Sequence, residues 1–178
     1  MEMGFARRTG RRPPWAVAGE GLLAGLAGTA VMTGAQTQVL PRLPIPEGPK
    51  PRRAPRMPPE RAARDENTTE TAARRIWEGL THRPLGPRQK AAGGYLLHFA
   101  FGASWGAALA LLRRRPTIPE GLAFGALVWM VSDNVLLRLL RLGDWPNRYP
   151  PGVHARALLA HLVWGAGTAA ALRALHRG

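Results

Sequence analysis

Four long runs of apolar and small residues dominate this chain, at 21–40, 91–112, 118–140 and 153–172. The first two runs contain no charged residue, and the last contains only Arg156. Each run has about the 20 residues that an α-helix needs to cross a bilayer. A soluble four-helix bundle would need a polar stripe along each helix, and the stretch GLLAGLAGTAVM has none. We therefore predict an all-α, helical integral membrane protein with four transmembrane helices at about 16–40, 91–112, 118–140 and 153–175.

A basic N-terminal tail at 1–15 precedes this single membrane domain at 16–178. The tail, the first apolar run and Thr33-Gly34-Ala35 also resemble a signal peptide that is cleaved after Ala35. The apolar run continues past that point to Leu40, which favours an uncleaved first helix.

A Pro/Arg-rich connection at 41–90 separates the first two spans. Eight prolines between Pro41 and Pro59 are too many for a helix or sheet and predict an extended strap. Asn67 and Glu70 then predict the start of a short amphipathic helix. This helix either lies in the membrane interface or is solvated and packs on the spans. Its spacing separates apolar from charged side chains: Ala72, Ala73, Ile76, Trp77 and Leu80 against Arg74, Arg75 and Glu78.

The charge pattern bears on the partners of the chain. The net charge is +14 and 23 of the 25 basic residues are arginine, which alone would suggest a nucleic acid or a membrane surface. The arginines flank the spans or lie in the strap, rather than alternating with aromatic residues on a folded surface. We therefore expect the lipid bilayer and its anionic headgroups as partners, and no nucleic acid. A second copy of the chain or another membrane protein is a further candidate.

Polar residues recur at one depth in the spans. With a rise of about 1.5 Å per residue, His98, Asp133 and His161 lie roughly 10–12 Å from the ends nearest the strap. A carboxylate at membrane depth is a functional hypothesis by default, and imidazoles are its natural partners. The alternative is that these groups only form hydrogen bonds between helices. The candidate buried polar layer consists of Gln36, His98, Asp133, His154 and His161.

Glycines share helix faces with several of these polar residues. His98, Gly102 and Gly106 are spaced by four, and His161 and Gly165 are also spaced by four. Small residues let helix backbones approach one another in lipid. The predicted helix-packing glycines are Gly21, Gly25, Gly102, Gly106, Gly121, Gly125 and Gly165.

Several motifs also resemble a known family. HFAFGASWG at 98–106, GLAFGALVW at 121–129 followed by Ser132-Asp133, and PPGVHARALLAHLVWG at 150–165 are similar to the YagU-related, small four-span bacterial membrane proteins. The resemblance extends over roughly 21–175 and includes PPERAAR at Pro58–Arg64. Related sequences often have Glu where this chain has Asn134, and a proline near Arg138. The resemblance implies a bacterial inner-membrane protein and supplies no substrate.

Enzyme signatures are scarce in this sequence. There is no cysteine, no GxxxxGK[ST] phosphate loop and no HExxH, and Asp133 has no second carboxylate within its span apart from Glu120 near the start. We therefore expect no enzymatic activity and no cofactor. The favoured function is a structural or accessory membrane protein of unassigned activity. The alternative is a permeation or sensing protein in which the His/Asp layer binds a proton or a transition metal.

Arginines next to the short connections set the expected orientation. Arg7, Arg8, Arg11 and Arg12, then Arg113–Arg115, then Arg173 and Arg177 all share one side of a four-span chain. Arginine in short flanks marks the cytoplasmic side, so we expect a multi-pass protein with both termini in the cytoplasm. The long connection carries twelve basic and six acidic residues and then faces outward, although loops of this length follow the rule less strictly.

Reporter fusions test this orientation. Fusions after Arg12, Arg115 and Gly178 should all report a cytoplasmic location, and a fusion near Pro59 should not, because arginine flanks control insertion. A Gly178 fusion outside the cell combined with an Arg12 fusion inside would mean that one segment does not span the membrane.

Overall fold

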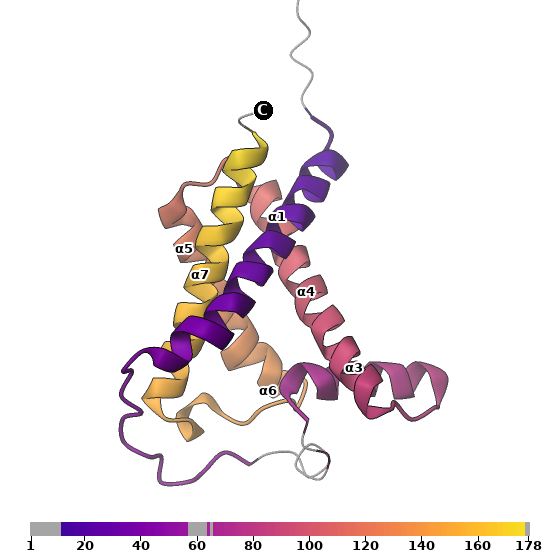
Figure 1. The fold of residues 1–178 in the computed structure, drawn as a ribbon, viewed down its shortest axis with the longest axis vertical. Coiled ribbons are helices and arrows are strands. Elements are labelled where there is room, and N and C mark those ends of the chain that lie inside the picture. The colour runs from indigo at the N-terminus through magenta and orange to yellow at the C-terminus, as the bar shows by residue number, and fades with distance from the viewer. Residues whose placement is uncertain (1–11, 57–63, 65, 177–178) are drawn as a thin grey trace, which may run out of the picture.

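The computed structural model describes residues 12–56, 64 and 66–176, and over these residues it consists of helices and loops (Figure 1). Four helical segments are long and apolar enough to cross a membrane: Pro14–Arg42, Pro87–Leu112, Ile118–Leu139 and Pro151–Leu175. The predicted all-α membrane fold with four spans is thus confirmed. Residues 1–11 of the predicted basic tail lie outside the described residues.

Proline in the first turn begins each span. Helices α1 (Pro14–Gly34), α4 (Pro87–Leu112) and α7 (Pro151–Leu175) begin with it, and α5 (Ile118–Val131) has Pro119 as its second residue. Proline suits this position because its missing N–H would have no partner there. In α5 the Thr117 hydroxyl accepts from Glu120 N, and Thr117 N donates to Glu120 Oε2 at 2.8 Å. Glu120, one of three charged residues in the third run, therefore serves as a helix cap.

The four spans pack as a row rather than a closed ring. Helix α1 packs against both α4 and α7, and α5 packs against α7. The backbones of α4 and α5 lie apart, and the rings of Trp105 and Phe124 meet edge to face between them, with a centroid distance of 5.9 Å. Figure 1 shows α4 and α7 diverging from the end that carries the termini toward the end that carries α3 (Thr68–Thr81). The bundle is therefore tight at one end and open at the other.

Glycines make the close contacts of α1 with α4. A Cβ at Gly25 would lie 2.5 Å from Gly102 O, and a Cβ at Gly21 would lie 2.5 Å from Ala107 Cα. Gly106 faces the backbone of Gly21 and Gly25 in return. Backbones that approach this closely gain dispersion contacts in lipid, where no hydrophobic effect drives helix association.

The other helix pairs are built in the same way. A Cβ at Gly121 would lie 2.5 Å from Gly165 O, and Gly125 faces the backbone of His161. Gly28 lies against Thr168 of α7 and so joins α1 to that helix. All seven predicted packing glycines therefore lie at helix contacts.

The strap is held against the first turns of α7 and the loop before that helix. Residues 43–56 form no helix or strand, which agrees with the predicted extended chain. Arg156, the one charge of the fourth run, donates to Glu47 Oε1 at 3.1 Å, and Gly152 N donates to Glu47 O at 3.0 Å. Arg56 N donates to Asp144 Oδ2 at 2.7 Å. The bond from Arg56 holds the pKa of Asp144 below its ordinary value, together with the bonds from Trp145 and Arg148. Burial of the carboxylate acts in the opposite direction and raises this pKa, but the bonds outweigh it.

Helix α3 begins at the predicted capping box. Asn67 Oδ1 accepts from Glu70 N at 2.9 Å, and Asn67 N donates to Glu70 Oε2 at 2.9 Å. The helix packs on α4 and crosses the open end of the bundle in Figure 1. Its charged side is the more buried one: Arg74 is 4% exposed, whereas Ile76 and Leu80 are 52% and 79% exposed. Of the two alternatives, the exposed apolar side chains agree better with a helix at the membrane interface. Of the PPERAAR segment, 58–63 lies outside the described residues.

Alanine substitutions at two glycines of α1 test the packing. Gly25→Ala places a methyl group against the backbone of α4, and we expect a loss of stability of about 1–3 kcal/mol from overpacking. Gly19→Ala is the matched control, because nothing lies within 4 Å of a Cβ at that position. Unfolding in mixed detergent micelles, followed by circular dichroism, measures both. Equal stability of the two variants would contradict the glycine contacts.

Candidate functional site

A cavity of about 470 Å³ occupies the open half of the bundle. All four spans contribute to its walls, and α3 covers one end. The size is in the usual range for small-molecule sites in proteins. The lining residues are apolar with a few polar groups: Thr29, Met32, Gln36, Thr68, Thr69, Ala72, Ile76, Leu97, His98, Phe101, Gly102, Ser132, Asp133, Leu136, Leu137, Leu140, Leu142, His161 and Trp164.

The structure brings together four of the five predicted layer residues. Gln36, His98, Asp133 and His161 all line the cavity. His154 does not. Its Nε2 donates to Pro146 O at 2.8 Å, in the loop before α7.

His154 belongs to a separate aromatic contact. Its ring meets Trp129 and Tyr149 edge to face, with a centroid distance of 6.3 Å to each. This residue therefore fastens the first turn of α7 to the third span and the preceding loop. The sequence prediction placed His154 in the layer with the residues that line the cavity, but the structure places it outside the cavity.

Two π-helical turns lie beside the cavity. One covers Ala35–Val39 at the end of α1, and the other covers Ser132–Leu136 between α5 and α6 (Leu137–Leu139). Gln36 lies in the first turn and Asp133 in the second. Such turns are rare and frequently occur at functional sites. They also explain why a regular helical period left the direction of Asp133 unsettled, since that period does not apply within them.

Asp133 and His161 face each other across the cavity wall. His161 Nε2 lies 3.9 Å from Asp133 Oδ1, and the two side chains are 12% and 30% exposed respectively. His161 Nδ1 lies 2.9 Å from Ala157 O, and because a carbonyl oxygen only accepts, Nδ1 carries a hydrogen. In the neutral imidazole, Nε2 then carries a lone pair, and this lone pair faces the carboxylate. A second proton at Nε2 would convert this contact into an ion pair.

His98 has a different partner. Its Nε2 lies 3.4 Å from Thr33 Oγ1, whose own hydrogen is donated to Thr29 O at 2.8 Å. The hydroxyl is therefore the acceptor, and His98 Nε2 is the donor. This contact joins α4 to α1. Sequence reasoning missed Thr33, although it lies one helical turn before Gln36.

The base of the cavity is aromatic. Trp164 is 2% exposed and its ring lies 6.2 Å from that of Phe124. In the described part of the chain the Trp164 Nε1 hydrogen has no acceptor. A Cβ at Gly102 would lie 3.2 Å from this nitrogen, so the glycine makes room for the indole. The HLVWG ending supplies Trp164, but sequence alone did not assign it to the site.

A buried ion-pair network holds α3 over the cavity. Arg74 Nε donates to both oxygens of Glu66 at 3.0 Å, and Arg74 Nη1 donates to Glu78 Oε2 at 2.9 Å. Lys90 Nζ of α4 donates to Glu66 Oε1 at 2.9 Å. Burial raises the pKa of Glu66, but the hydrogen bonds and charges of Lys90 and Arg74 outweigh it and hold that pKa below its ordinary value.

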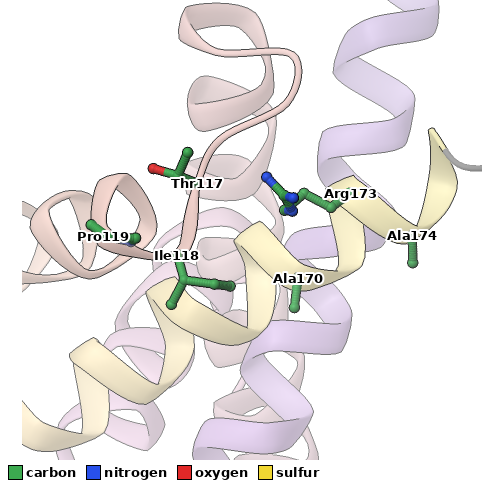
Figure 2. Close-up of a pocket in the computed structure, with 6 residues that line it drawn as sticks. All are labelled: Thr117, Ile118, Pro119, Ala170, Arg173 and Ala174. Atoms are coloured by element: carbon green, nitrogen blue, oxygen red, sulfur yellow. The ribbon is translucent and has the colours of Figure 1, made fainter.

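A second hollow lies at the opposite end of the bundle. It has a volume of about 520 Å³ between the start of α5 and the last turns of α7. Figure 2 shows Ile118 and Ala170 along it, with Arg173 extending toward Thr117. The Thr117 and Glu120 cap already satisfies this helix end, so the hollow offers little unsatisfied polar chemistry.

The structure does not support a nucleophilic serine or a metal site among the described residues. The sequence GASWG at 102–106 matches the GxSxG pattern of nucleophilic serines, but it lies inside α4 rather than on a strand-to-helix turn. Ser104 Oγ donates to Ala100 O of its own helix at 2.8 Å. In the described residues, no three His, Asp or Glu side chains gather closely enough to hold a metal ion.

Comparisons of the chain with protein-family models, with curated proteins and with solved structures each find no match. The resemblance to the YagU-related family therefore stays a prediction, and the site is interpreted from its own geometry.

Acid and a Glu66 variant test the network. Because the pKa of Glu66 is lowered by folding, its stabilisation is complete above about pH 4.3 and is lost as pH falls through the lower folded value. Hydrogen exchange of the α3 amides, corrected for intrinsic rates, should show this loss. Glu66→Gln should lower the opening free energy of α3 by about 3–5 kcal/mol and remove the acid dependence.

Glu78→Gln is the matched control for this test. Glu78 also binds Arg74, but its side chain is 31% exposed. We expect a loss of about 1 kcal/mol or less. Similar losses for the two variants would show that the buried position of Glu66 does not matter.

Proposed function

We propose that this chain is a non-enzymatic, multi-pass membrane protein whose cavity binds a proton at the His161–Asp133 pair. The proton sets the charge of the cavity, so the protein acts as a proton-responsive permeation or sensing protein. The observation that carries this proposal is the 3.9 Å approach of an imidazole nitrogen, with its other nitrogen already bonded to Ala157 O, to a carboxylate in a membrane cavity.

A purely structural role for the polar layer has weaker support. Most hydroxyl groups near the cavity bond to their own helix: Thr29 to Gly25 O, Ser132 to Val128 O and Thr168 to Trp164 O. The contact of His98 with Thr33, at 3.4 Å, is long. Glycine contacts already join the helices without this layer. Polar side chains around a hollow are better suited to binding than to holding the bundle together.

Charge explains why this pair responds to protons. Histidine is the side chain whose ordinary titration lies between about pH 5 and 8. A carboxylate within about 4–6 Å favours the charged imidazole, while burial opposes it. Uptake of a proton replaces the repulsion between a lone pair and a carboxylate by attraction. The cavity then changes from negative to neutral.

Few other charged groups face the pair. Among the described lining residues, His98 of α4 is the one further titratable group, and the residues from α1 and α3 are all uncharged. Arg138 of α6 lies outside the lining, with its guanidinium carbon 4.7 Å from the centre of the Trp145 ring. The carboxylate therefore depends on His161 for compensation.

We also propose the setting in which the chain works. The predicted bacterial inner membrane and cytoplasmic termini fit the arginine-rich end of the bundle, which meets anionic headgroups. There Arg114 donates to Arg12 O at 2.9 Å and Arg115 donates to His176 O at 3.2 Å, which brings both chain ends to one side. The YagU-related family remains the proposed family.

Titration of the histidines tests the proposed function. Nitrogen NMR of the full chain in lipid nanodiscs follows His161 between pH 4 and pH 9. Asp133→Asn keeps the size and hydrogen bonding of the side chain but removes its charge. Because the negative charge beside Nε2 is then lost, His161 should gain its second proton only at a lower pH than in the parent.

His154 provides the internal control, because it lies outside the cavity and should titrate alike in both proteins. Asp133→Leu should impair folding as well. An unchanged His161 titration in a folded Asp133→Asn protein would overturn the proposal.

A further inference from the structure

The cavity excludes positive charge from a strongly positive chain. The chain has 25 Lys and Arg residues and a net charge of +14, yet none of those that the structure describes lines the cavity. Among the described residues, Asp133 is the one carboxylate in the lining. When His161 and His98 are neutral, the cavity therefore carries a single negative charge.

The polar atoms of the cavity are mostly acceptors. Ser132 Oγ lies 2.7 Å from Val128 O and 3.0 Å from Asp133 Oδ1, so its hydrogen is used within its own helix segment. His161 presents the lone pair of Nε2 because Nδ1 holds the hydrogen. Trp164 Nε1 and the amide of Gln36 are donors in the lining, and neither carries a formal charge. The one formal charge in the described lining is that of the Asp133 carboxylate, which together with the hydroxyl and imidazole acceptors favours a ligand that brings positive charge.

Aromatic and aliphatic walls complete the cavity. Phe101 and Trp164 line it, and aromatic faces attract ammonium groups through their ring quadrupoles. Leucines from α4 and the third span form much of the remaining surface. These walls suit apolar substituents around the charge rather than a hydrated metal ion.

The cavity also has an apolar rim. The backbones of α4 and α5 lie apart, with the rings of Trp105 and Phe124 in contact between them, and Ile76 and Leu140 of the lining are each 52% exposed. A ligand with apolar substituents can therefore enter from lipid or from the interface beneath α3 without meeting an arginine in the lining.

We infer that the cavity binds a small organic cation, an ammonium ion with apolar or aromatic substituents, whose charge lies against Asp133. The inference rests on the proposed proton site, because the cation and the second proton of His161 neutralise the same carboxylate. They therefore exclude each other, and binding of the cation releases a proton when His161 is charged.

The experiment uses the full chain in nanodiscs of uncharged phosphatidylcholine, with binding measured by isothermal titration calorimetry. The probe is benzyltrimethylammonium, and its uncharged isostere is neopentylbenzene. At pH 7.5 we expect saturable binding of the cation, weakened about tenfold or more in Asp133→Asn because a close charge pair is lost. The isostere should bind the parent and this variant alike.

Glu47→Gln provides the charge control. Glu47 lies in the strap, outside the cavity, and its side chain is 67% exposed. This variant removes one negative charge at the same end of the bundle, so cation binding should stay at the parent level. An equal loss in Glu47→Gln and Asp133→Asn would show a general electrostatic effect and overturn the inference. So would absence of cation binding to the folded parent, with helicity checked by circular dichroism.

The pH dependence separates this inference from the proposed function. In the parent, cation binding should weaken as pH falls from 7.5 to 5, and in His161→Gln it should change little. If cation binding depends on Asp133 but the titration of His161 does not, the proton site is overturned and the cation site is supported. If the titration of His161 depends on Asp133 but cation binding does not, the cation site is overturned and the proton site is supported.

Discussion

Close contact between glycine backbones is the constraint on which the rest of this structure depends. Gly21 and Gly25 of α1 meet Gly102 and Gly106 of α4, and a glycine on α7 meets those of α5. These contacts draw the helices together near the ends that carry the termini. Toward the other end of the bundle, Thr29 and Met32 of α1 line the cavity, and helices α4 and α7 diverge (Figure 1). The cavity occupies the space that begins where the glycine contacts end, so packing at one end creates the hollow at the other.

Two carboxylates show how burial and charge are balanced in different ways. Glu66 is 5% exposed and is neutralised by Arg74 and Lys90, so it is fixed in its charged form and fastens α3. Asp133 has only an imidazole as its ionic partner among the described residues, at 3.9 Å. A permanently charged arginine or lysine forms an ion pair that does not change near neutral pH, whereas the charge of a histidine partner depends on pH. For these two carboxylates, the partner therefore decides the role: Glu66 with Arg74 and Lys90 is structural, and Asp133 with His161 is the site proposed to respond to protons.

The sequence was sufficient for features that follow from local rules. Span length, the proline and capping positions, and the spacing of glycines identified the four spans, the start of α3 and the helix contacts. It failed where tertiary contacts override the helical period. The direction of Asp133 could not be predicted because it lies in a π-helical turn, and His154 forms its bond to Pro146 O only because a loop folds back beside it. The burial of Arg74 could not be predicted from the spacing within α3, because its acidic partner Glu66 precedes the helix.

The third span connects the cavity to its cover. Arg75 of α3 donates to Leu140 O at 2.8 Å and to Arg141 O at 3.3 Å. Arg141 has a φ of 53°, a left-handed conformation that costs about 1–3 kcal/mol for a residue other than glycine. The Arg75 bonds stabilise that strained turn, which is separated from the π-helical turn that holds Asp133 only by the three residues of α6. Asp133 of the cavity and the residues that hold α3 therefore lie within one short stretch at the end of the third span, so a shift in this stretch would be felt by both.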